Sequence, residues 1–215
     1  QKIALHRINE EKPFLVVMAF PFTVWSTLQR LKKNQATLVD LRERDRKLLK
    51  FVKTVCKLQS AAGRHFLLEN PAGSDAWKEP LMIDVRSMPG VDEVVAHMCA
   101  FNKQAQGMLI KKPTRFVSSA PWELKFLDKQ REGGHPHADF LKISRTGATG
   151  EYTPELAAAI VKGIKHQKAA DRARVACPVE ADRLEEAFLS ERRRQWGVPR
   201  EHGALPVTLQ DRGLN

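Results

Sequence analysis

Apolar residues along the chain occur either in short continuous runs or at helical spacing. The continuous runs predict strands at residues 14–18, 65–70, 91–98 and, interrupted by Pro113, over 107–120. The helical pattern, together with proline and glycine positions, predicts helices at 1–10, 38–62, 75–88, 121–129 and 153–167. Strands that alternate with helices predict an α/β domain with a mainly parallel sheet.

Individual residues sharpen some of these boundaries. Gly63 is expected to cap the end of the long helix, because a glycine just beyond a helical pattern is a common C-cap. Thr153 is expected to cap the start of the last helix, with Pro154 at its first position. The run at 14–18 is expected to be covered on both faces, as in a parallel sheet.

The composition changes after about residue 165. We expect an α/β domain over 1–165, an exposed basic helix over 166–197, and a disordered tail or linker over 198–215.

The net charge is +11, which favours a polyanionic partner such as nucleic acid, although a merely solubilising basic surface explains it equally well. The three cysteines are too few for a disulfide scaffold, so an intracellular location, nuclear or cytoplasmic, is expected. No apolar run approaches the roughly 20 residues that span a membrane, and no membrane partner is expected.

Two loops stand at the ends of the first two predicted strands, "FPFTVWS" and "ENPAGS". A strand and one long helix separate them, so the two strands should be neighbours in the sheet. Functional groups gather at the carboxyl ends of such strands, and both loops should therefore open onto one crevice.

The loops belong to a longer series of matching segments. In order these are "AFPFTVWSTLQ", "GRHFLLENPAGSDAW", "HMCAFN", "KKPTRF", "HPHADFL" and "YTPELAAAIVKGI". The series resembles cytosine-C5 DNA methyltransferases and, more closely, the methyltransferase-like domains of retroelement-type polyproteins in protist genomes. The resemblance spans residues 12–164 and implies a Rossmann-like methyltransferase fold.

In that family a cysteine attacks the cytosine ring and a glutamate stabilises it. The resemblance places the glutamate at Glu69, with Asn70 bracing the loop, and the cysteine at Phe22. Phe22 has no lone pair with which to attack, and Thr23 and Ser26 are hydroxyls without an evident base beside them. We therefore expect no C5 methylation by this chain. The residues expected to line the substrate crevice are Pro21, Thr23, Ser26, Asn70, Pro71 and Trp77, although Glu69 could be a solvated carboxylate and Trp77 a core residue.

S-adenosylmethionine is the cofactor that the resemblance implies. Its glycine-rich loop and acidic residue should lie upstream of Gln1, so the chain is expected to be an N-terminally truncated fragment that lacks the first strands. No cofactor is expected in this chain by itself.

Two further sets of residues are weaker candidates. Lys111, Lys112 and Arg115 could contact nucleic-acid phosphates, although paired lysines are usually a solvated face. Zinc is commonly bound by cysteine and histidine, and the candidate ligands here are Cys99, His135 and His137. A structural zinc site needs four ligands, so a buried cysteine beside a polar loop is the simpler interpretation.

The leading hypothesis is a degenerate, non-catalytic methyltransferase-like domain of a retroelement-type polyprotein that retains nucleic-acid binding. One alternative is a DNA methyltransferase that is active only within a longer chain. Another is a protein-interaction domain whose basic charge is incidental.

Overall fold

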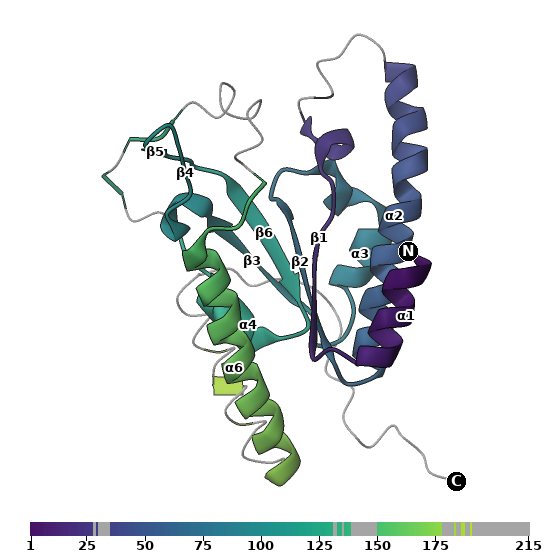
Figure 1. Ribbon diagram of the computed structural model, residues 1–215, viewed down its shortest axis with the longest axis vertical. Coiled ribbons are helices and arrows are strands. Elements are labelled where there is room, and N and C mark those ends of the chain that lie inside the picture. The colour runs from purple at the N-terminus through teal and green to yellow at the C-terminus, as the bar shows by residue number, and fades with distance from the viewer. Residues whose placement is uncertain are drawn as a thin grey trace. The chain divides into compact units, whose positions relative to one another are not determined.

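The computed structural model describes residues 1–27, 29, 35–130, 133–134, 136–138, 150–177, 183, 186–187 and 190 (Figure 1). Its helices are α1 (Lys2–Glu11), α2 (Gln35–Ala61), α3 (Pro80–Arg86), α4 (Pro121–Leu127) and α6 (Pro154–Ala176), with 3₁₀ turns η1 (Thr23–Trp25), η3 (Asp75–Lys78) and η4 (Met98–Phe101). Its strands are β1 (Leu15–Ala19), β2 (His65–Pro71), β3 (Asp92–His97), β4 (Gln104–Ala105), β5 (Met108–Leu109) and β6 (Pro113–Ser118).

The chain divides into two compact units, Gln1–Gln167 and Lys168–Asn215. The boundary falls within α6, close to the predicted domain boundary at residue 165. The last turns of α6 belong to the second unit. The helix was predicted to end at residue 167, but it continues to Ala176. The predicted tail over 198–215 lies outside the described residues.

The main sheet has the strand order β1-β2-β6-β3. β1 pairs with β2 in parallel, whereas β6 is antiparallel to both β2 and β3. The expectation of a mainly parallel sheet is therefore wrong: two of the three pairings between these strands are antiparallel. After β3 the chain turns back through η4 and the β4–β5 hairpin, so that β6 returns in the opposite direction between β2 and β3.

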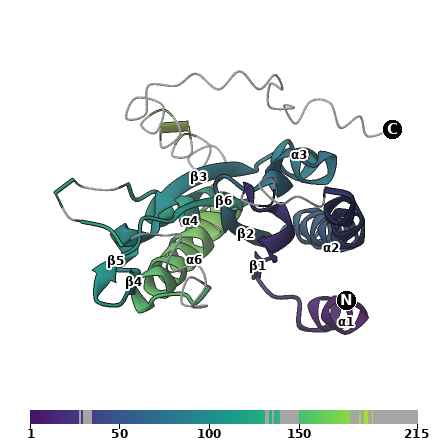
Figure 2. The same ribbon diagram turned by 90° about the horizontal axis from the view of Figure 1, so that it is seen from above.

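Helices cover both faces of this sheet (Figures 1 and 2). One hydrophobic core joins the sheet to α2 and α3 and includes Leu49, Phe66 and Met82. The other joins it to α4 and α6 and includes Leu124 and Leu156. The predicted α/β class is confirmed at this level.

β1 is an edge strand among the described residues. Its residues are half-buried or exposed, and Val17 is 41% exposed. The expectation that both faces of this run are covered is therefore wrong. A continuous apolar run is typical of a doubly covered strand, but the run alone does not specify where the strand lies in the sheet.

The predicted helix boundaries are largely confirmed. Gly63 has a left-handed backbone conformation (φ +64°) just beyond α2. Thr153 caps α6, because its Oγ1 accepts a hydrogen bond from the Leu156 amide at 3.2 Å. The same hydroxyl donates to the Phe101 carbonyl at 2.7 Å, which ties the start of α6 to η4. Among the described residues, no helix has the length and apolar character needed to cross a membrane.

Candidate functional site

The ends of β1 and β2 lie side by side, as predicted. Ala19 and Glu69 are partners in the parallel register, so the loops that follow them leave the sheet together. The Asn70 side chain is buried, and its Nδ2 donates a 2.7 Å hydrogen bond to the Phe20 carbonyl. Asn70 thus braces the first loop, which is the role that the family resemblance implies for it.

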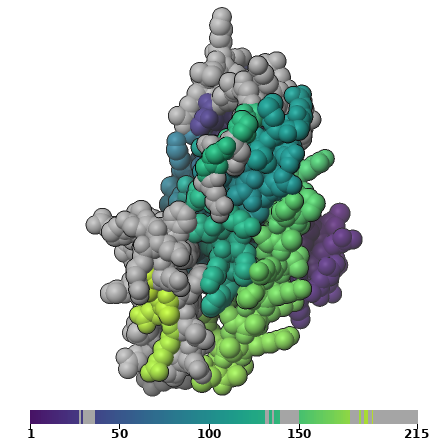
Figure 3. All heavy atoms as spheres, turned by 90° about the vertical axis from the view of Figure 1, so that its left-hand side faces the viewer, coloured from purple at the N-terminus to yellow at the C-terminus, as the bar shows by residue number. Residues whose placement is uncertain are grey.

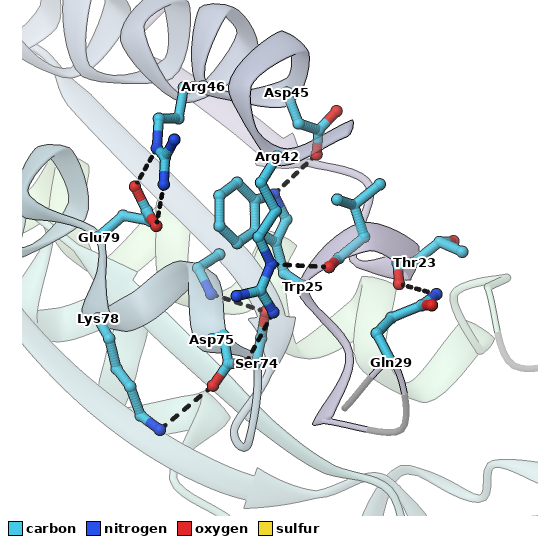
Figure 4. A network of polar contacts seen from close by, with 12 residues as sticks. Thr23, Trp25, Gln29, Arg42, Asp45, Arg46, Ser74, Asp75, Lys78 and Glu79 are labelled. Carbon is cyan, nitrogen blue, oxygen red and sulfur yellow. Dashed lines mark hydrogen bonds and ion pairs between the residues drawn. The ribbon is translucent and has the colours of Figure 1, made fainter. Parts of the chain in front are cut away.

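Helix α2 holds both loops through one arginine (Figure 4). Arg42 Nη2 lies 2.9 Å from Asp75 Oδ2 at the start of η3, directly after the second loop. Its Nε donates at 3.4 Å to the Val24 carbonyl in the first loop, and its guanidinium lies 5.2 Å from the Trp25 ring centre. Trp25 is fully buried and donates through Nε1 to Asp45 at 2.7 Å. The relative position of the loops is therefore set from the α2 side.

Further polar contacts surround this clamp (Figure 4). Arg46 binds both carboxylate oxygens of Glu79, at 2.7 and 3.2 Å, and Lys78 lies 3.2 Å from Asp75. Within the first loop, the Gln29 amide donates to the Thr23 carbonyl at 2.8 Å. This network is structural, since its charged groups are matched with one another.

A buried ion pair joins the end of β2 to the residue before β6. Glu69 is 8% exposed and Lys112 is 7% exposed, and Lys112 Nζ lies 3.6 Å from Glu69 Oε1. Burial raises the pKa of the Glu69 carboxyl, and the Lys112 ammonium offsets part of that effect. Lys112 was predicted as a possible phosphate contact, but its charge faces Glu69.

The Phe22 ring lies next to the ammonium group of this ion pair. The Lys112 ammonium lies 5.6 Å from the centre of the Phe22 ring, within the range of a cation–π contact. The ring is half-buried. The position that the resemblance assigns to a nucleophilic cysteine is thus filled by an aromatic ring beside the Lys112 ammonium group.

Sequence reasoning missed Lys103 and Tyr152. Lys103 is 4% exposed and donates through Nζ to the Glu151 main-chain carbonyl. Burial lowers the pKa of Lys103, and the positive charge of Lys112 lowers it further. Burial also raises the pKa of Tyr152, which is 37% exposed, and the Glu69 carboxylate adds to that rise. Tyr152 opens the matching segment "YTPELAAAIVKGI" but was given no role, and Lys103 lies outside the matching segments; distant parts of the chain bring both near Glu69.

Trp77 belongs to the core side of the second loop. It is buried, its Nε1 donates to the Pro71 carbonyl at 2.9 Å, and it packs edge-on against Phe20 with ring centres 5.7 Å apart. This matches the core interpretation of Trp77 rather than a role as a stacking surface. Among the other predicted lining residues, Pro21 and Thr23 are exposed, and Ser26 and Pro71 are half-buried.

The predicted nucleic-acid contacts divide into different environments. Lys111 is exposed. Arg115 bonds to the buried carboxylate of Glu93, which also binds Arg86. Burial would raise the pKa of Glu93, but the two guanidinium groups hold it below its usual range. Arg115 also lies 5.9 Å from the Trp77 ring centre, so its charged group contacts Glu93 and Trp77 within the protein.

The candidate metal ligands do not form a group in the part of the chain that the structure describes. Cys99 is buried, His137 forms an isolated bridge with Leu109, and His135 lies outside the described residues. Among the described residues, no set of three His, Cys, Asp or Glu side chains is arranged to hold a metal ion.

S-adenosylmethionine would require a glycine-rich turn in the resembled family. The loop after β1 is described at residues 20–27 and 29 and has no glycine there, and the loop after β2 has Gly73 alone. The glycine-rich loop that the resemblance implies was expected upstream of Gln1, so these two loops are described by their own side chains. No protein-family model, curated protein or solved structure matches the chain.

Proposed function

We propose that this chain is a non-catalytic, Rossmann-like module of the methyltransferase type that binds unpaired nucleic acid at the crevice beside Glu69. The observation that carries the proposal is the Phe22 ring, which lies beside the Lys112 ammonium, itself 3.6 Å from Glu69. We place the module in a retroelement-type polyprotein, in line with the resemblance of its sequence motifs.

The side chains around the crevice suit a nucleotide. A half-buried aromatic ring offers a face on which any base can stack, which contributes about 1–3 kcal/mol per base. The ring lies beside the Lys112 ammonium, which is itself paired with Glu69, and the exposed Lys111 next to it can contact a phosphate. A base paired within a duplex could not reach these groups, so the ligand is single-stranded or has a base flipped out.

The same arrangement argues against C5 methylation. Covalent attack on a base requires an activated nucleophile, and the Phe22 ring supplies none. The nearest hydroxyl in the loop, Thr23, is exposed, and its carbonyl accepts the Gln29 amide. Binding without methyl transfer is therefore the function that we assign to the crevice.

The test is fluorescence anisotropy with a labelled single-stranded DNA, measured over a range of salt concentrations. We expect wild-type affinity to fall as salt rises, because the exposed Lys111 contacts phosphates in this proposal. Phe22→Ala should weaken binding by about 5- to 100-fold through the loss of stacking. Phe14→Ala is a matched control, since Phe14 is also half-buried but packs on His65 at the opposite end of β1.

Each outcome decides a part of the proposal. Wild-type protein that binds no oligonucleotide at low salt would contradict nucleic-acid binding and favour the protein-interaction alternative. Equal losses in Phe22→Ala and Phe14→Ala would place the binding site elsewhere. Transfer of a labelled methyl group from S-adenosylmethionine to DNA would overturn the non-catalytic assignment.

A further inference from the structure

Another buried carboxyl group lies away from Glu69, in the first turn of α4. Glu123 is fully buried, and its Oε2 lies 3.2 Å from Ser118 Oγ. Its other oxygen, Oε1, is buried without a hydrogen-bond partner among the described residues. An ionised carboxylate in such a place would leave a buried charge uncompensated, which is strongly unfavourable.

The hydrogen bonds of Ser118 show where a proton must lie. A serine hydroxyl has a single hydrogen to donate and can accept two hydrogen bonds. Ser118 Oγ donates to the Phe66 carbonyl at 2.6 Å and accepts from the Ala120 amide at 3.0 Å. With its hydrogen engaged by Phe66, Ser118 can bond to Glu123 only as an acceptor. The hydrogen in that contact must then come from the carboxyl group.

We propose that Glu123 is a protonated carboxylic acid in the folded protein, that its O–H donates a hydrogen bond to Ser118 Oγ, and that loss of this proton loosens the contact between α4 and α6. The bond joins the end of β6 to α4, and Ser118 extends the connection to β2 through Phe66. The site is therefore a proton-dependent joint between the sheet and its α4–α6 layer.

Helix α6 meets this joint at very close range. A Cβ atom built on Gly163 would lie only 2.7 Å from the Glu123 Cα, so the backbones of α4 and α6 touch at this residue. The Trp122 amide, one residue earlier, donates to Gln167 Oε1 of α6 at 3.1 Å. Figure 3 shows α6 (green) beside the teal segments that include α4. A charge placed on Glu123 would be introduced directly into this helix contact.

The charged and titratable groups around the joint are directed elsewhere. Asp92 of β3, which pairs with Ser118 in the register, accepts the Glu93 amide, and His65 of β2 bonds to the Ser119 carbonyl. On α6, His166 and Lys162 pack on Phe126, while Lys125 of α4 lies over Trp122. Burial raises the pKa of Glu123 to about 8.

The sign of the pH effect follows from the raised pKa. The folded state holds the proton more tightly than the unfolded chain, whose glutamate has a pKa of about 4.3. The stabilising contribution is complete below that value and is lost as pH rises toward about 8. Between these limits the unfolding equilibrium constant should rise about tenfold per pH unit because of this group alone.

The experiment compares urea unfolding of the wild-type protein and Glu123→Gln from pH 5 to pH 9. The amide of glutamine can donate to Ser118 at every pH, so the variant should lack the Glu123 contribution to the pH slope. Glu10→Gln, at an exposed position of α1, should keep the wild-type slope. At pH 9, amide hydrogen exchange in α6 should be faster in the wild type than in Glu123→Gln, with equal rates at pH 6.

A direct measurement covers the case in which the variant does not fold. The infrared spectrum of the wild-type protein at pH 6 should contain the carbonyl band of a protonated carboxyl group, and this band should disappear as pH passes about 8. The proposal is overturned if that band is missing at pH 6. A slope in Glu123→Gln equal to the wild-type slope would overturn it as well, as would equal α6 exchange rates at pH 9.

Discussion

The Lys112 ammonium lies 3.6 Å from the Glu69 carboxylate, and both side chains are almost completely removed from solvent. A buried pair of this kind contributes little compared with two apolar residues, but removal of one partner leaves the other charge uncompensated. Stability should therefore be far more sensitive to loss of Lys112 than to loss of the exposed Lys111.

Lys112→Met should lower the free energy of unfolding by about 3–5 kcal/mol at neutral pH. The pKa of Glu69 is already raised by burial and should rise further without the ammonium, so the loss should be larger at pH 8 than at pH 5. Urea denaturation at both pH values measures this. Lys111→Met should change stability by no more than about 0.5 kcal/mol. Equal effects of the two substitutions would mean that the ion pair is not formed.

Arg42→Met should detach the loop after β1 from the loop after β2. Asp75 is buried and would lose its closest cation, at a cost of about 1.5–3 kcal/mol. Arg46→Met is the control, because Arg46 is 40% exposed and exposed ion pairs contribute only about 0–1 kcal/mol. Hydrogen exchange should show faster opening of both loops in Arg42→Met alone. Unchanged exchange would rule out the clamp.

Gly163→Ala should destabilise the protein although alanine favours helices by about 1 kcal/mol. The added methyl group would lie 2.7 Å from backbone of α4, and relief of such overpacking typically costs about 1–3 kcal/mol. Gly73→Ala has open space around the new methyl group and should be neutral or slightly stabilising. Thermal unfolding of both variants checks the contrast. A stabilised Gly163→Ala would contradict the close approach of the helices.

The cysteines should differ sharply in reactivity. Cys56 and Cys99 are buried, burial also raises the pKa of the Cys56 thiol, and Cys177 is exposed. A thiol reagent at pH 8 should therefore modify Cys177 rapidly in the native protein, and Cys56 and Cys99 only after urea is added. Cys177→Ser should abolish the fast phase. A fast reaction that persists in this variant would show that the core around Cys56 or Cys99 opens readily.

The sequence was sufficient to place the loop that carries Phe22 beside the strand end that carries Glu69 and Asn70. Their positions depend on where two strands end and on those strands being neighbours, and both properties can be inferred from apolar runs and the length of the intervening helix. The direction of β6 could not be inferred in this way. Parallel and antiparallel strands buried on both faces have similar apolar patterns, and only long-range pairing distinguishes them.

The sequence also did not show which lysines are buried and which are exposed. Lys111 and Lys112 are the same residue type in adjacent positions, yet one is exposed and the other is paired with Glu69. Neighbouring residues in an extended segment point in opposite directions, so a small shift in register would exchange their roles. Lys103 and Tyr152 reach the same site through tertiary packing, which no local spacing specifies.

The position of β6 also has a consequence for how the protein is made. A ribosome completes β3 before β6, but β3 has no partner in the described sheet until Pro113–Ser118 has been synthesised and has inserted beside β2. A nascent chain that ends before this strand would present unpaired backbone on both β2 and β3, and such edges promote aggregation. Completion of the sheet therefore depends on a late segment that enters its middle rather than its rim.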